Sequence, residues 1–396
     1  MKKRILIFSL VYYPRFVGGA EVAIKEITDR ISSAEIEFDM VTLRSRGEKK
    51  FERIGNINIY RVGIPLLGHA FNKYLYLKTG FWKAIFLNRK HRYDAIWSMM
   101  ATYNSFAALF FKLFHPKVPF LLTLQEGDPI PFIKRRGKPL WMFFKMIFTR
   151  ADYIQTISNY LADFAREMRY EIGKARRECP ITVVPNGVDV KHFSQVVTDT
   201  QKQEVYAQIS ATGTFARKES DVLLITTSRL VPKNAVGDIV ESLVHLPANY
   251  KLIICGKGKE REMLEQKVAS HDFIHRVYFA DYVSHADMPV WLQASNVFIR
   301  PSLSEGFGNS FIEAMAARIP VIATPIGGIV DFLKDRETGL FCEVSNPQSI
   351  AQKVLEITKD QNLLQHVVSS AFAMVQNKYD WNNVAGQMKR IFNEVC

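Results

Sequence analysis

The chain has few cysteines, no long apolar run and no Asp-x-Asp motif. Its cysteines, Cys179, Cys255, Cys342 and Cys396, stand alone, without a CxxC pair or a Cys/His cluster. We therefore expect neither a zinc site nor a disulfide framework, and a reducing, cytoplasmic compartment fits. No apolar run reaches the roughly 18–20 residues that a membrane-spanning helix needs. Without Asp-x-Asp we also expect no metal bound with phosphate, and no other cofactor.

Acidic residues are scarce in the first half of the chain. Residues 1–185 contain 31 Lys and Arg against 16 Asp and Glu, whereas the remainder contains 21 against 23. A strongly basic half indicates an anionic partner, which can be a membrane surface, a nucleic acid or a charged substrate. The sequence carries no recognisable nucleic-acid-binding motif, so we do not expect nucleic acid as the partner.

Short apolar strands alternate with amphipathic helices along most of the 396 residues. This alternation predicts an α/β fold with doubly wound parallel sheets. We expect an N-terminal domain over residues 1–195, a polar linker over 196–220 and a C-terminal domain over 221–379. The expected N-domain strands are Arg4–Leu10, Phe38–Leu43, Ile57–Val62, Ala95–Ser98, Pro119–Leu124, Tyr153–Thr156 and Thr182–Val184. The expected N-domain helices include Phe71–Asn88, Asn104–Phe114, Lys138–Phe148 and Asn159–Met168.

The stretch from Asn296 to Asp331 combines a strand, a Gly-rich loop, a helix from about Asn309, a second strand and a second Gly loop. Glu305 lies in the first loop and Glu313 lies one turn into the helix. Backbone N–H groups at a helix N-terminus bind phosphate, so this layout fits a nucleotide-sugar. Two plainer interpretations stay open. Ser310-x-x-Glu313 also matches a capping box, and Glu305 can be an ordinary solvated carboxylate.

This stretch, PSLSEGFGNSFIEAMAARIPVIATPIGGI, resembles the signature of glycosyltransferase family 4, also called glycosyl transferases group 1. These retaining enzymes have the GT-B fold, in which two Rossmann-like domains face each other across a cleft. The resemblance implies that Glu305 contacts the donor sugar and Glu313 the ribose. It also implies that the last helix, residues 380–396, crosses back to the N-domain. Arg318 departs from the family pattern, which has Gly there; we expect this to affect the turn rather than the chemistry.

Further donor-binding residues are implied by the same resemblance. Arg229 and Lys233 follow a predicted strand, where a guanidinium fork and an ammonium suit a diphosphate. The donor-binding set is Gly18, Gly19, Arg229, Lys233, Tyr282, Val283, Glu305, Gly306, Phe307, Gly308, Asn309, Ser310 and Glu313. Tyr282 and Val283 would lie beside the base, and Gly18 and Gly19 beside the diphosphate.

Gln125 stands where the family often has a histidine near the acceptor. Glutamine cannot act as a general base, so a mechanism that needs histidine at this position is excluded. Glu126 and Asp128 are the nearest ionisable substitutes, although both can simply be loop carboxylates. The predicted catalytic residues are Glu305, Asp128, Arg229 and Lys233.

Two stretches of the basic half mix aromatic side chains with cations. One covers residues 71–92, and the other covers residues 132–145. Such stretches suit an anionic membrane surface, unless the aromatics belong to the core and the cations to a solvated face. We predict a membrane or acceptor face at Lys134, Arg135, Arg136, Lys138 and Trp141.

The sequence therefore predicts a retaining glycosyltransferase that moves a sugar from a UDP- or GDP-sugar to a lipid-linked or polysaccharide acceptor. It would be cytoplasmic and peripheral at the inner face of the membrane. Two alternatives stay open: a nucleotide-sugar-processing isomerase on the same fold, and a non-catalytic adaptor that binds nucleotide-sugar or membrane.

Overall fold

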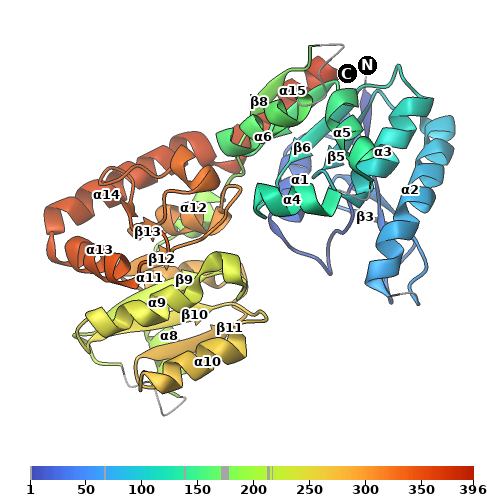
Figure 1. Ribbon diagram of the computed structural model, residues 1–396. Helices are drawn as coiled ribbons and strands as arrows, with labels where there is room; N and C mark the ends of the chain where they lie inside the picture. The colour runs from blue at the N-terminus through green and yellow to red at the C-terminus, as the bar shows by residue number, and fades with distance from the viewer. Residues whose placement is uncertain (1, 67, 138–139, 171–177, 212–214, 216) are drawn as a thin grey trace. The chain divides into compact units, whose positions relative to one another are not determined.

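The computed structural model divides the chain into two compact units, each built on one sheet (Figure 1). It describes residues 2–66, 68–137, 140–170, 178–211, 215 and 217–396. Unit 1 comprises Met1–Asn186 and Trp381–Cys396, and unit 2 comprises Gly187–Asp380. The predicted α/β class is therefore confirmed in each unit.

Unit 1 contains an eight-stranded sheet in the order β3-β4-β2-β1-β5-β6-β7-β8. All neighbours pair in parallel except β3 and β4, which are antiparallel. The strands are β1 (Lys3–Phe8), β2 (Ile36–Leu43), β3 (Phe51–Ile54), β4 (Ile57–Val62), β5 (Ala95–Met99), β6 (Phe120–Leu124), β7 (Tyr153–Thr156) and β8 (Ile181–Val183). The helices are α1 (Gly19–Asp29), α2 (His69–His91), α3 (Tyr103–Phe114), α4 (Ile130–Gly137), α5 (Trp141–Arg150), α6 (Asn159–Tyr170) and α15 (Trp381–Val395).

The C-terminal helix α15 completes the core of unit 1. Its Phe392 ring packs edge-on against Phe38 and Trp97, with ring centroids 5.7 and 5.0 Å apart. At its end, Lys3 donates hydrogen bonds to Asn393, and Figure 1 shows the two termini side by side. Burial of one such phenylalanine contributes roughly 2–3 kcal/mol, so α15 is an integral part of this unit.

Unit 2 contains a six-stranded parallel sheet in the order β11-β10-β9-β12-β13-β14. The chain adds strands outwards from β9 to one edge of the sheet and then outwards from β12 to the other edge. The order of strand addition therefore reverses between β9 and β12. The strands are β9 (Val222–Thr227), β10 (Tyr250–Cys255), β11 (Val277–Asp281), β12 (Val297–Arg300), β13 (Val321–Ala323) and β14 (Leu340–Phe341). The helices are α7 (Val190–Phe193), α8 (Asp199–Ser210), α9 (Val236–Ser242), α10 (Arg261–Ser270), α11 (Met288–Gln293), α12 (Asn309–Ala316), α13 (Pro347–Lys359) and α14 (Gln361–Met374).

The stretch expected as a polar linker, residues 196–220, contains the helix α8, which was not predicted from the sequence. Thr198 and Gln201 form a capping box at the start of α8, and Val205 and Ile209 bury its inner face. Two buried residues give too weak a periodicity to be noticed in a polar sequence. The edge strand β3 was also missed. The expected helix Lys138–Phe148 begins among residues outside the described ones, and α5 starts at Trp141.

Within the described part of the chain, no helix is both long and apolar enough to cross a bilayer.

Candidate active site

The site in unit 2 lies at the carboxyl ends of β9 and β12, the two strands between which the order of strand addition reverses. Loops that follow adjacent strands diverge at such a point and leave room for a ligand. The loop after β9 carries Arg229 and Lys233, and the loop after β12 carries Glu305. The two loops are joined by a hydrogen bond of 2.6 Å from the backbone N–H of Leu303 to the carbonyl of Lys233. The loop that carries the predicted diphosphate-binding residues and the loop that carries the predicted sugar-binding residue are therefore held together.

Arg300, the last residue of β12, lies at the centre of a buried polar cluster. One Nη atom donates to Glu305 Oε2 at 2.6 Å and to Asn234 Oδ1 at 3.0 Å. The other Nη atom donates to Ser310 Oγ at 2.8 Å. The Arg300 and Glu305 side chains are only 11% and 9% exposed, so this ion pair is shielded from water. Glu305 is thus not the solvated loop carboxylate that the plainer interpretation suggested.

Arg300 was missed in the sequence. The only signal was a charged residue at the end of an otherwise apolar strand, immediately before Pro301. Such a residue is uninformative until its partners are known, and they come from three separate loops.

The loop after β9 is held in place by its own backbone. Asn234 donates from Nδ2 to the carbonyl of Arg229 at 2.6 Å. Gly256 and Gly258 lie so close to this loop that a Cβ would come within 1.8 Å of the Ser228 oxygen and 2.1 Å of the Leu230 oxygen. Arg229 itself is exposed, and within the described residues it forms no ion pair. A fixed backbone therefore presents a guanidinium to solvent.

Helix α12 begins differently from the capping-box interpretation, which is wrong. The N-cap is Gly308, with φ of 95°, and Ser310 is already inside the helix. The Ser310 hydroxyl accepts from Arg300 instead of capping the helix. Glu313 is consequently not a cap partner, and its Oε1 lies 3.7 Å from Nε2 of His285.

Glycine is required at the start of α12 and at the second Gly loop. A Cβ on Gly308 would come within 2.5 Å of the Phe311 ring. A Cβ on Gly327, where φ is 52°, would come within 2.0 Å of the Glu305 carbonyl oxygen. The same carbonyl accepts from the N–H of Gly328 at 3.1 Å. The second Gly loop therefore fixes the backbone of Glu305.

The other predicted donor-binding residues of unit 2 differ in exposure. Phe307 is buried against Phe332 and Tyr379, so only its backbone can serve a ligand, whereas Asn309 at the start of α12 is half-buried. Tyr282 follows β11 and is 72% exposed, and Val283 is half-buried beside it. An exposed aromatic ring of this kind can stack on a base.

Gly18 and Gly19 lie in unit 1, at the start of α1. Gly18 is the N-cap, and its N–H donates to Glu21 Oε2 at 2.9 Å. Burial raises the pKa of the Glu21 carboxyl. Both glycines are exposed, so their predicted role beside a diphosphate stays a prediction.

The loop after β6 carries Gln125, Glu126 and Asp128. Gln125 donates from Nε2 to Asn186 Oδ1 at 3.0 Å. Asp128 is half-buried at the end of this loop, and its catalytic role stays a prediction. Glu126 is 4% exposed; its Oε1 accepts from the Ala101 N–H at 2.6 Å, while Oε2 has no hydrogen-bond partner among the described residues. Burial raises the pKa of Glu126 to about 7.

The predicted membrane or acceptor face on α4 and α5 is partly engaged in internal contacts. Lys134 pairs with Glu167 at 2.7 Å, Arg135 lies 5.5 Å from the Phe132 ring, and Lys145 lies 5.0 Å from the Trp141 ring. Lys138 lies outside the described residues, as does the side chain of Arg136.

Two family models match the chain in succession. The model for Glycosyltransferase Family 4 matches residues 17–192, and the model for Glycosyl transferases group 1 matches residues 212–374. The chain belongs to glycosyltransferase family 4. This family 4 enzyme is therefore a glycosyltransferase, and the resemblance carried by Glu305 and Glu313 is confirmed.

Relatives and solved structures agree with this assignment. An uncharacterised glycosyltransferase of Methanocaldococcus jannaschii is 22% identical over 98% of this chain and 97% of its own length. The N,N'-diacetylbacillosaminyl-diphospho-undecaprenol alpha-1,3-N-acetylgalactosaminyltransferase of Campylobacter jejuni is 23% identical over 82% of this chain and 83% of its own length. The structure of Anabaena HepE in complex with UDP and glucose is 17% identical, covers 99% of this chain and 100% of its own, and has a TM-score of 0.78. The predicted GT-B fold is thereby confirmed, while the cleft between the two domains stays a prediction.

Proposed function

We propose that this glycosyltransferase moves a sugar from a nucleoside-diphosphate donor, a UDP- or GDP-sugar, to a lipid-linked or polysaccharide acceptor. The observation that carries the donor half is the polar cluster at the carboxyl ends of β9 and β12. It places a fixed carboxylate, an exposed guanidinium and a helix N-terminus around one edge of one sheet. The UDP in the HepE structure and the undecaprenol-linked acceptor named for the Campylobacter relative support the two halves.

In the proposed reaction the bond between the sugar C1 and the β-phosphate oxygen breaks while the acceptor oxygen bonds to C1 on the same face. Negative charge develops on the leaving diphosphate, where Arg229, Lys233 and the N-terminus of α12 would stabilise it. Glu305 would position the sugar and favour its cationic ring, and Glu313 would bind the ribose. The leaving phosphate would take the acceptor's proton, which accommodates Gln125. We propose that no metal is needed, so transfer should persist in EDTA.

A thermal-shift panel of UDP-, GDP-, ADP- and TDP-sugars tests the donor site. A ligand that binds only the folded protein stabilises it and so raises Tm. At a ligand concentration of 100 times Kd, the free energy of unfolding rises by about 2.7 kcal/mol. We expect one nucleotide series to raise Tm, and the matching donor to yield free nucleoside diphosphate and a new glycoside. A Tm unchanged by every donor would contradict the proposal and favour the adaptor. An altered sugar without transfer would favour the isomerase.

The acceptor half of the proposal rests on the outer face of α2. The residues on the exposed side of this helix follow a helical stripe of aromatics and cations, with no acidic residue between 69 and 91: Phe71, Tyr74, Lys78, Trp82, Phe86, Arg89 and Lys90. Trp82 and Phe86 are 58% and 61% exposed. Both rings therefore lie outside the core, although Tyr76 of the same helix is fully buried, and their exposure supports a surface role for this face.

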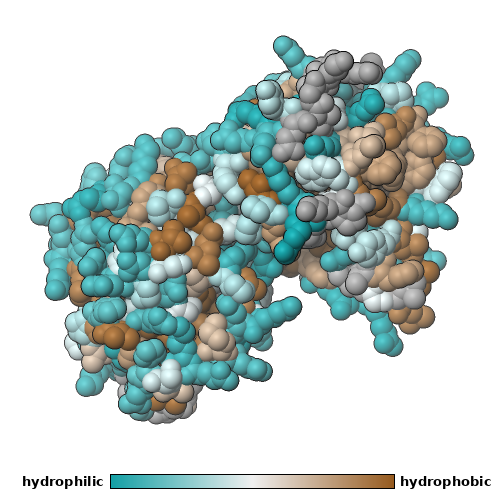
Figure 2. Space-filling model, in the orientation of Figure 1, coloured by the Kyte–Doolittle hydropathy of each residue, from teal (hydrophilic) through white to brown (hydrophobic). Residues whose placement is uncertain are grey.

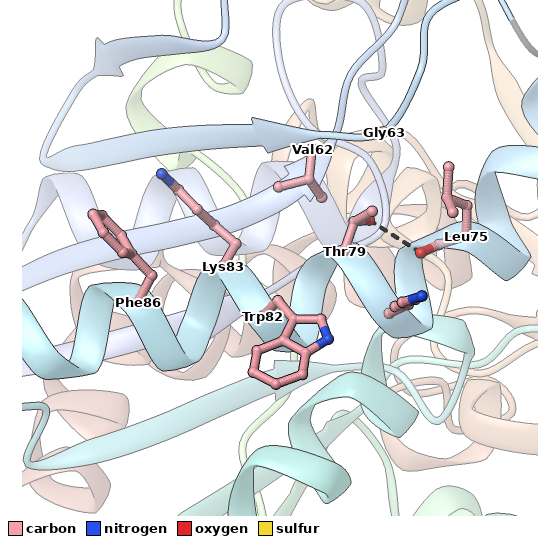
Figure 3. Close-up of a pocket in the computed structure, with 8 residues that line it drawn as sticks. Val62, Gly63, Leu75, Thr79, Trp82, Lys83 and Phe86 are labelled. Atoms are coloured by element: carbon pink, nitrogen blue, oxygen red, sulfur yellow. Dashed lines mark hydrogen bonds between the residues drawn. The ribbon is translucent and has the colours of Figure 1, made fainter.

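A shallow groove of about 630 Å³ runs between the end of β4 and this helix (Figure 3). Val62 and Gly63 line it from the strand, and Trp82, Lys83 and Phe86 line it from the helix. Lys83 lies 5.4 Å from the Phe86 ring, and desolvation lowers the pKa of its ammonium. Figure 2 shows apolar surface over the part of unit 1 that holds α2 and α3. Apolar rings beside cations suit the headgroup region of an anionic bilayer.

Vesicle sedimentation tests this face. The protein should bind vesicles of anionic phosphatidylglycerol and not those of neutral phosphatidylcholine. Reversing Lys78, Arg89 and Lys90 to Glu should weaken binding roughly 100-fold, since each cation near such a surface contributes about 1 kcal/mol. Glutamates at Lys218, Lys359 and Lys378, exposed in unit 2, make the same change in net charge and should have little effect. Equal losses from both triple variants would contradict a specific docking face.

A further inference from the structure

Arg300 differs from Arg276, a half-buried arginine of unit 2, in how its hydrogen bonds are used. Arg276 precedes β11 and donates from Nε, Nη1 and Nη2 to backbone carbonyls, among them those of Tyr250 and Leu243. Arg300 donates only to side chains, and its buried Nε has no hydrogen-bond partner among the described residues. An incompletely satisfied buried cation costs stability, so a purely structural role does not explain it.

The three acceptors of Arg300 belong to three parts of the proposed donor site. Glu305 would contact the donor sugar. Asn234 holds the carbonyl of Arg229 in the proposed phosphate-binding loop, and Ser310 lies in the first turn of α12. The planar guanidinium is a fork that sets the angle between its acceptors, which a lysine ammonium does not do. One side chain thus fixes the direction of the Glu305 carboxylate relative to both phosphate-binding elements.

We propose that Arg300 is a positioning residue, which holds Glu305 in the orientation needed for the donor sugar and couples it to the diphosphate-binding loop. This inference rests on the proposed function. Arg300 would act through Glu305 and not by touching the donor, because its side chain lies almost wholly beneath the loop surface. Loss of the fork should slow transfer while leaving the affinity for the nucleoside diphosphate nearly unchanged.

The first test compares R300K and R300M with the wild type and with R276K. Misplacing a reacting group by about 1 Å costs roughly 100-fold in rate, so we expect kcat to fall 10–100-fold in both Arg300 variants. The Kd for the nucleoside diphosphate alone should change less than about 3-fold, because the phosphate contacts stay in place. R276K should lower Tm without lowering kcat. An R300K variant that resembles R276K in both respects would overturn the proposal.

A double-mutant cycle with E305Q tests whether the effect passes through the carboxylate. If Arg300 acts only through Glu305, R300M/E305Q should be no slower than E305Q alone. Losses that multiply would overturn the proposal. Should R300M fold poorly, R300A offers a second route: millimolar guanidinium should restore part of the transfer, and the same concentration of ammonium should not. Restoration by neither ion would count against the guanidinium's role.

The wild type is assayed beside every variant, which separates the two ideas. A wild type that transfers no sugar from any donor refutes the proposed function. An active wild type with an equally active R300K refutes only the role of Arg300.

Discussion

The two units treat polar groups at the carboxyl ends of their strands in opposite ways. In unit 2, Glu305 and Asn234 both accept hydrogen bonds from Arg300, whose Nε alone stays without a partner among the described residues, and glycine contacts lock the backbone around them. In unit 1, Glu126 is buried with one oxygen unpaired, and the aromatic rings of Trp82 and Phe86 on α2 are turned outwards. A cluster prepared in advance suits a ligand whose shape is constant, whereas an incompletely satisfied site with an apolar surface suits a partner still to be bound.

This contrast explains why one half of the chain was easier to interpret than the other. Binding of a nucleoside diphosphate demands the same hydrogen-bond donors in the same geometry, so under the proposed function the sequence of unit 2 would be constrained around Glu305 and Glu313. If Gln125 lies at the acceptor, as proposed, a different acceptor would allow a different residue there without altering the fold.

Removing the carboxylate charge of unit 2 should have the largest effect. Glu305→Gln keeps the shape of the side chain but leaves the Arg300 guanidinium without its ion-pair partner. We expect transfer to fall about 1,000-fold, in the range of other electrostatic groups at reacting centres. Steady-state kinetics with the donor found by thermal shift would measure it. Glu262→Gln, an exposed change on α10, should be silent. Near-normal transfer by Glu305→Gln would show that the cluster is not the reacting site.

Removing the buried acid of unit 1 should act on stability and in a pH-dependent way. The folded-state pKa of Glu126 is about 7, above its ordinary value of 4.5, mainly because of burial. The folded protein therefore holds this proton more tightly than the unfolded chain, and stability falls as pH rises from 4.5 through 7. The full cost above pH 7 is about 3 kcal/mol.

Glu126→Gln removes that titration and keeps an oxygen for the Ala101 N–H. The free energy of unfolding of the variant should exceed that of the wild type at pH 8, and the two values should converge near pH 4.5. Urea titrations at both pH values measure the difference. A gain that is the same at both would mean that Glu126 does not titrate in this window, and unit 1 would then be as well satisfied as unit 2.

The strand framework was predictable because it rests on apolar runs, but the site was predictable only in part. Strands β4 and β7 coincide with their predicted bounds, Ile57–Val62 and Tyr153–Thr156. The polar helix α8 was not predicted, because only Val205 and Ile209 mark its inner face. Glu305 was found from its loop and helix context. Arg300 was not, because its importance depends on partners 66 residues upstream and 10 downstream in the sequence.

The smallest effect should come from Arg318, the residue that replaces the family's glycine. Its φ is 60°, in the left-handed region, and its guanidinium lies 3.6 Å from the centre of the Phe372 ring. Glycine would remove a backbone cost of about 1 kcal/mol but lose an exposed cation–π contact of about 0.5–1 kcal/mol and gain freedom in the unfolded chain. Arg318→Gly should therefore change stability by less than about 1 kcal/mol.

Arg318→Ala separates these terms, because it loses the ring contact and keeps the left-handed backbone. It should be less stable than Arg318→Gly by about 1 kcal/mol, measured by chemical denaturation, while both bind the donor as the wild type does. If Ala were as stable as Gly, the turn would carry no backbone cost. If either changed donor affinity, the departure at this position would concern the chemistry, and the fixed cluster of unit 2 would extend beyond the residues around Glu305.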